Sequence, residues 1–146
     1  MDDVRGLVEA DTRMLLMAQE AGEVPLISAL VQDAIVRRAD IAYDRRARRL
    51  VLLLDRYRWE ANDRTRVRSA LRIESATRVQ RRGWTEGSPN DPGIGVLDLL
   101  AFTLDDDVLT IVFAAGATLR VAVECVDVIL EDVSPPWSTG HEPDHP

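Results

Sequence analysis

Residues 64–82 alternate between polar and apolar side chains along most of their length. Even positions carry polar groups, most of them arginines: Arg64, Arg66, Arg68, Arg72, Glu74, Arg78, Gln80 and Arg82. Odd positions carry apolar groups: Val67, Leu71, Ile73 and Val79. A helix would scatter these arginines around its circumference, whereas a strand places alternate side chains on opposite faces. The pattern predicts one long strand, or two strands joined at a bulge, with an ionic face and an apolar face.

The other segments predict an α+β domain that is mainly antiparallel β. Further strands are expected from period-two patterns and apolar runs at 14–18, 35–44, 49–60, 96–104, 108–114 and 118–124. A helix is expected at 24–34, where Pro25 suits the first turn and apolar residues follow at helical spacing. A short second helix is expected at 125–133 from similar spacing. About seven strands and a closing helix also fit a pleckstrin-homology-like barrel.

The length of 146 residues corresponds to one domain. We expect this domain at 13–134, after a loose N-terminal extension at 1–12 and before a flexible tail at 135–146. The longest uncharged apolar run, 108–119, is too short to span a bilayer. The acidic start lacks the features of a signal peptide. We therefore expect no membrane span and a cytoplasmic location. The single cysteine, Cys125, is expected to be a small buried side chain.

The charges are unevenly distributed along the chain. All 18 basic residues are arginines, and 15 of them lie in residues 37–82 beside only 6 acidic residues. The rest of the chain is strongly acidic, so the net charge of −7 conceals a basic middle. Such asymmetry indicates either an anionic partner or ion pairs between the middle strands and acidic ones.

The predicted arginine face is the main candidate site. Its members come from the strands at 49–60 and 64–82: Arg56, Arg58, Arg66, Arg68, Arg72, Arg78 and Arg82. A turn at 62–63 would place Arg58 opposite Arg66 and Arg56 opposite Arg68, which requires a neutralising group. The neutraliser is either internal, from acids near in sequence or on the neighbouring strand, or external, such as an acidic protein, a phosphate or a lipid head group. Nucleic acid is disfavoured, because the net charge is negative and no aromatic residue interleaves with these arginines.

An alternative candidate site is a ligand pocket. Asp55, Tyr57 and Trp59 share one face of a predicted strand, and the glycine- and proline-rich segment 83–95 is long enough to act as a lid that carries Trp84. Asp55 would be an acid of this pocket, or, more simply, the partner of a neighbouring arginine.

Catalytic and metal-binding motifs are scarce. The two histidines, His141 and His145, fall in the predicted tail, so the domain offers no histidine for a nucleophile triad. The prolines around them prevent a regular metal-binding helix, and we expect no metal and no cofactor.

Several stretches resemble a bacterial family, domain-of-unknown-function family 2948. They are residues 24–36, 54–60, 121–126 and 130–133, with the following Pro136 and Trp137. The resemblance covers about residues 14–146, and the first dozen residues depart from it. It implies a small bacterial cytoplasmic protein, and it brings no catalytic or binding residues because the family has no assigned activity.

These features together predict a non-enzymatic interaction module that presents the arginine face to an anionic or acidic partner. The alternative is a small-ligand-binding protein or an enzyme that uses the pocket described above. The amphipathic helix at 24–34 could instead serve a homodimer.

Overall fold

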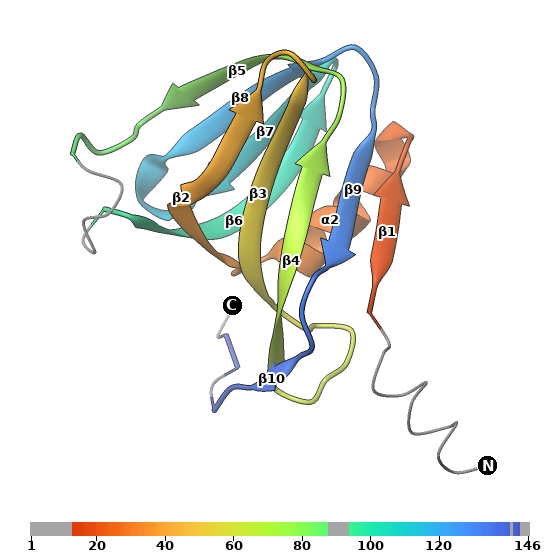
Figure 1. Cartoon of the computed structure of the whole chain (residues 1–146), viewed down its shortest axis with the longest axis vertical. Helices are drawn as coiled ribbons and strands as arrows, with labels where there is room; N and C mark the ends of the chain where they lie inside the picture. Colours follow the sequence, from red (N-terminus) through yellow and green to blue (C-terminus); the bar gives the residue numbers. More distant parts are fainter. Residues whose placement is uncertain (1–12, 88–93, 141, 144–146) are drawn as a thin grey trace.

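A computed structural model describes residues 13–87, 94–140 and 142–143 (Figure 1). These residues form ten strands, one α-helix and two short 3-10 helices. The elements are β1 (Leu15–Ala18), η1 (Ala21–Glu23), α2 (Val24–Val31), β2 (Ile35–Asp44), β3 (Arg49–Tyr57), β4 (Thr65–Ile73), β5 (Ala76–Arg82), β6 (Val96–Asp105), β7 (Val108–Phe113), η2 (Ala114–Gly116), β8 (Thr118–Val123), β9 (Val128–Asp132) and β10 (Trp137–Ser138).

The strands form a continuous antiparallel sheet that folds over on itself. Its order is β1-β9-β4-β3-β2-β6-β7-β8-β5, and β10 pairs with β4 outside this path. We call β1, β9, β4, β3 and β2 sheet A, and β6, β7, β8 and β5 sheet B. The two sheets are joined where residues 35–37 of β2 pair with residues 96–98 of β6. Figure 1 shows them as two layers.

The hydrophobic core lies between the two sheets and beneath α2. It is built from alternate residues of each strand, which a sheet with one buried face requires. The helix contributes Val24, Ile27, Leu30 and Val31 to it and packs mainly against β6. It ends earlier than the expected residue 34, because Asp33 has a positive φ that a helix cannot include.

The predicted long strand is confirmed as two strands, β4 and β5. They meet at Glu74–Ser75, where Ser75 has a positive φ of 56°. In β4 the odd residues from Val67 to Ile73 are buried, and the even residues except Ala70 are partly exposed, as the period-two pattern predicts. Because of this bend, the alternating segment 64–82 contributes a strand to each layer: β4 belongs to sheet A and β5 to sheet B.

The expected C-terminal helix is wrong. Residues 128–132 form β9, which is inserted between β1 and β4. Val128 and Leu130 are fully buried, and β-branched residues such as Val128 and Ile129 favour a strand when two partner strands are available. The barrel topology therefore lacks the closing helix that it was expected to have. Ten strands replace about seven, because β9 and β10 were not expected and the strand at 64–82 divides in two.

Candidate functional site

The register between β3 and β4 moves Arg56 away from the predicted arginine face. Asp55 lies opposite Arg68, so the expectation that Arg56 faces Arg68 is wrong by one residue. The cause is the connection at 58–64, which is a longer loop than the tight turn we expected. Because a shift of one residue moves a side chain to the other side of a sheet, Arg56 points into the core and is fully buried.

The buried Arg56 guanidinium is balanced by acids inside the protein. Its two terminal nitrogens donate to the Glu60 carboxylate, each at 2.8 Å, and its Nη2 lies 3.1 Å from Asp132. Ser69 donates its hydroxyl to Asp132 at 2.7 Å. Burial lowers the pKa of Arg56, but the hydrogen bonds and charges of Glu60 and Asp132 outweigh burial and raise it. For Glu60, burial raises the pKa, and the bonds to Arg56 outweigh this effect and lower it. Arg56 is therefore a structural cation.

The four arginines of the predicted face that come from β4 and from the loop after β3 are also paired within the chain. Arg58 bonds to Asp63 at 3.3 Å, and Tyr57 rather than Arg58 lies opposite Arg66. Arg68 bonds to Asp40 at 3.0 Å and to Asp55 at 3.1 Å, and Arg72 lies 3.8 Å from Glu131. Arg66 donates to the backbone oxygens of Asp33 and Asp55. In this part of the sheet the arginine charges are therefore neutralised by groups within the chain, which is the internal one of the two alternatives given above.

Arg78 and Arg82 are the members of the predicted face that stay exposed. They point outward from β5, and their register partners are Ala122 and Thr118 of β8. Arg120 points outward from β8 between them, opposite Gln80. None of the three arginines has an ion pair with a residue that the structure describes.

The predicted pocket residues are divided between two places. Asp55 pairs with Arg68, which is the simpler of its two expected roles. Tyr57 is buried, with its ring 4.7 Å from that of Trp59, and the Trp59 indole donates to the Gln32 carbonyl oxygen. None of these three lines the cavity that contains Trp84.

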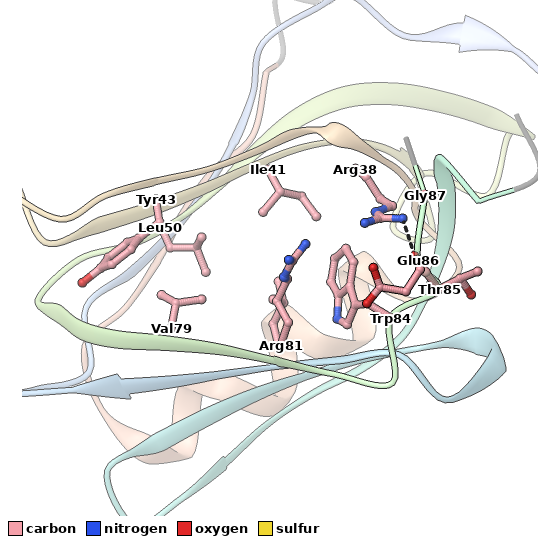
Figure 2. A pocket seen from close by; sticks show the side chains of 11 residues that line it. Arg38, Ile41, Tyr43, Leu50, Val79, Arg81, Trp84, Thr85, Glu86 and Gly87 are labelled. Atoms are coloured by element: carbon pink, nitrogen blue, oxygen red, sulfur yellow. Dashed lines mark hydrogen bonds between the residues drawn. The ribbon is translucent and has the colours of Figure 1, made fainter. Parts of the chain in front are cut away.

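A cavity of about 490 Å³ lies between β2 and β5 (Figure 2). We call it the seam cavity, because these two strands face each other there without pairing. Its lining comes from β2, β3, β5, β8 and the segment after β5: Arg38, Ile41, Tyr43, Leu50, Val79, Arg81, Trp84, Thr85, Glu86, Gly87 and Leu119. Its volume is within the range of about 300–1,000 Å³ that is usual for small-molecule sites.

Two guanidinium groups flank the Trp84 indole at one end of this cavity. Arg38 lies 5.1 Å and Arg81 lies 5.4 Å from the ring centre, within the range of a cation–π contact. The indole nitrogen donates to the Thr118 carbonyl oxygen at 2.7 Å. The ring centres of Trp84 and Phe113 lie 5.9 Å apart in an edge-to-face arrangement. The ring is therefore held rigidly and presents a fixed wall to the cavity.

Both ends of the seam are bridged by side chains. At one end the Tyr43 hydroxyl donates to the Ala76 carbonyl oxygen at 2.7 Å. At the other end Arg38 donates to the Thr85 carbonyl oxygen at 3.0 Å. The apolar walls between the bridges come from Ile41 and its neighbours across the seam (Figure 2). The space between the bridges is therefore crossed by a side chain at each end and stays partly open to solvent between them.

Arg81 and Arg38 were not among the predicted site residues. In β5 the side chains of Val79 and Arg81 share the inner side, opposite Val121 and Leu119 of β8. A charged residue at a position whose parity is otherwise uncharged was the sequence feature that marked Arg81. Arg38 had no comparable marker, because the bulge in β2 between Val36 and Ile41 changes which residues face inward.

Comparison with known families places this chain in one of them. A family model described as "Protein of unknown function (DUF2948)" matches residues 14–145. The chain belongs to the DUF2948 family. No curated protein and no solved structure matches this DUF2948 chain.

Other predicted features of the DUF2948 chain have mixed outcomes. Among the helices that the structure describes, none is long and apolar enough to cross a membrane. The described residues contain no cluster of three or more potential metal ligands, and His141 and His145 lie outside them, as do residues 1–12. The expectation that Cys125 is buried is wrong: it is exposed, with its sulfur 3.6 Å from the Ser75 hydroxyl.

Proposed function

We propose that this protein is a non-enzymatic binding module that takes a small organic anion in the seam cavity. The observation that carries the proposal is the pair of guanidinium groups, from Arg38 and Arg81, at one end of a cavity whose lining is part aliphatic and part polar and includes Glu86. Arg81 has no ion pair with any described residue, so its charge is available to a ligand. Guanidinium donors match the two oxygens of a carboxylate or phosphate.

The walls favour a ligand with an apolar body. Ile41, Val79 and Leu119 offer aliphatic surface, and the face of Trp84 suits a flat or flexible hydrocarbon. Burying such a body contributes about 25 cal/mol per Å² of apolar surface. The proposed ligand is therefore an organic acid whose anionic group lies at the arginines and whose hydrocarbon part extends toward Tyr43.

The side-chain bridges at the two ends favour a small molecule over a peptide. An extended chain that paired with the free edge of β5 would have to pass the Tyr43 bridge at one end and the Arg38 bridge at the other. Binding is favoured over catalysis because the lining residues include no paired nucleophile and base: the Tyr43 hydroxyl is already a donor to the backbone. The cytoplasmic location inferred from the sequence remains a prediction.

Titration of tryptophan fluorescence tests this proposal. The probes are octanoate, phenylacetate and phenyl phosphate, each compared with a neutral analogue such as the amide or alcohol. We expect a charged probe to change the emission, and the Trp84→Phe variant to lose the response. Arg81→Gln should weaken binding about 10–100-fold, because a charge-assisted hydrogen bond contributes about 1.5–3 kcal/mol.

Arg78→Gln is the matched control, because Arg78 lies on the same strand but points outward. It should leave the affinity unchanged. The proposal would be refuted if no anionic probe bound the wild-type protein at millimolar concentration, or if Arg81→Gln bound as well as wild type. If Arg78→Gln rather than Arg81→Gln lost binding, the proposal would also be refuted, because the anion would then bind on the outer side of β5, where Arg78, Arg82 and Arg120 lie.

A further inference from the structure

The outer side of sheet A carries apolar side chains that the described part of the chain covers only in part. They are Leu15, Met17, Val51, Leu53, Ala70 and Ile129, from β1, β3, β4 and β9. Leu15 is 60% exposed and Met17 is 46% exposed, whereas Val51, Leu53 and Ile129 are partly buried and Ala70 is buried. Figure 1 shows α2 on the opposite, core side of this sheet. We call these six residues the apolar patch.

The outer side of sheet B has a different composition. Its outward positions carry Thr103, Thr110, Thr118 and Arg120 as well as Ala101, Val108, Val112 and Ala122, a mixture that is normal for a sheet side that faces water. In β3, by contrast, residues 50–54 are apolar on both sides, a pattern typical of a strand that is buried on both sides. One copy of the chain buries only the inner of these two sides. The composition of β3 therefore points to a missing layer over sheet A.

We propose that a second copy of this chain supplies that layer, by packing its own apolar patch face to face against the first. Two sheets stacked in this way lie about 10 Å apart and interdigitate their side chains. Because the same patch would serve both copies, the contact would be a closed two-fold dimer. None of the patch residues lines the seam cavity, so this inference is independent of the proposed ligand.

The charges around the patch fit a second copy better than a partner of one charge sign. Five charged residues lie in or beside it, two basic and three acidic: Arg68, Arg72, Asp40, Asp55 and Glu131. Of these, Arg72 lies between Ile129 and Val51, and Glu131 lies between Leu15 and Ala70. They are already paired with one another, so this surface is nearly neutral on a chain whose net charge is −7. Two like-charged molecules approach each other most easily through such a surface.

The size of the surface is also sufficient for a dimer. The whole outer side of sheet A, with its charged residues as well as the apolar patch, has five strands at about 4.8 Å spacing that are up to about 30 Å long, which gives an area on the order of 600 Å². This matches the lower end of the area, about 600–1,000 Å² per partner, that stable protein interfaces bury. A contact of this size agrees with a dimer that dissociates on dilution.

Sedimentation velocity of the full chain, from micromolar to nearly millimolar concentration, tests the inference. We expect the wild-type protein to dimerise, and Leu53→Glu and Met17→Glu to remain monomeric at the same concentrations. Met17 lies on an edge strand and is largely exposed, so its variant should fold even if Leu53→Glu does not. Circular dichroism reports whether each variant folds.

Thr110→Glu is the matched control, because it adds the same charge to the outer side of sheet B and should still dimerise. The inference is overturned if the wild-type protein is monomeric throughout the concentration range, or if both patch variants dimerise like wild type. It is also overturned if a wild-type monomer begins to dimerise once residues 1–12 are removed, because those residues would then be the cover.

Discussion

Arg56 is a fully buried cation held by carboxylates from two distant parts of the chain. Glu60 comes from the loop after β3, and Asp132 is the last residue of β9. Met14 adds a third segment, because its backbone nitrogen donates to the second oxygen of Asp132 at 3.1 Å. One guanidinium therefore fastens β3, β9 and the start of β1 together. Such a cluster is costly to break, because each remaining charge would be buried without a partner.

Replacing Arg56 with alanine should lower the free energy of unfolding by about 3–5 kcal/mol, the usual cost of removing one member of a buried ion pair. Urea denaturation monitored by circular dichroism measures this loss. Arg78→Ala is the control, and it should change stability by less than about 0.5 kcal/mol because its side chain is exposed and unpaired among the described residues. Equal effects from the two variants would show that the cluster adds no stability.

Residue parity explains how much of the site the sequence could reveal. The alternation at 64–82 correctly separated Val67 and Leu71 from Arg66 and Arg68, because parity within a strand depends only on the pleat. It could not place Arg56, because parity across a hairpin depends on the length of the intervening loop. Partners such as Glu131 for Arg72 come from strands far apart in sequence, and no local pattern encodes them.

At the scale of elements, the turn after β5 determines where Trp84 lies. Gly83 has a φ of +75°, and a Cβ atom added to it would collide with the carbonyl oxygen of Gly116 in η2. The turn therefore lies directly against the connection between β7 and β8. This contact places Trp84 over the end of β8, where its indole reaches the Thr118 carbonyl oxygen.

Gly83→Ala should destabilise the protein by about 1–3 kcal/mol, because the new methyl group meets backbone atoms at a φ that alanine rarely adopts. It should also weaken binding of any anion in the seam cavity, because Trp84 is displaced. Thermal and urea denaturation measure the first effect. Gly22→Ala should be nearly neutral, since a Cβ there has no neighbour within 4 Å. A neutral result for Gly83→Ala would mean that the turn can shift without loss.

Most of the elements were predictable, and β9 shows why the exception arose. The spacing of Val126, Ile129 and Leu130 suits a helix, but Val128 and Leu130 also alternate with Ile129 in the manner of a strand. Tertiary structure determines that this segment is a strand, because it pairs with β1 along one edge and with β4 along the other. Local propensity gives way to such pairing, because both edges of the inserted strand gain hydrogen bonds.

At the scale of the whole molecule, charge and association are coupled. Each copy has a net charge of −7, whereas the patch proposed to join two copies is nearly neutral and apolar. The electrostatic repulsion between two copies therefore comes from the net charge of their whole surfaces and acts at long range. Attraction depends on the short-range burial of apolar side chains, which salt screens very little.

The dimer proposed above should consequently become stronger as salt is added. Raising the ionic strength shortens the Debye length to about 8 Å at 0.15 M and screens the repulsion between the copies. The paired arginines around the patch should contribute little to the change, because exposed ion pairs contribute only about 0–1 kcal/mol. Sedimentation at low and at near-physiological salt measures the dissociation constant. Weaker association in salt would show that ion pairs between the copies, rather than apolar contact, hold them together.

The position of β9 between β1 and β4 also has a consequence for synthesis of the chain. Strand β1 is synthesised before its sheet partner, which is a strand more than a hundred residues later. Until residues 128–132 emerge, β1 has no edge to join, and the Asp132 oxygens that bind Arg56 and Met14 are missing. Pairings between such distant segments form slowly. Sheet A is therefore completed only after β9 has been synthesised.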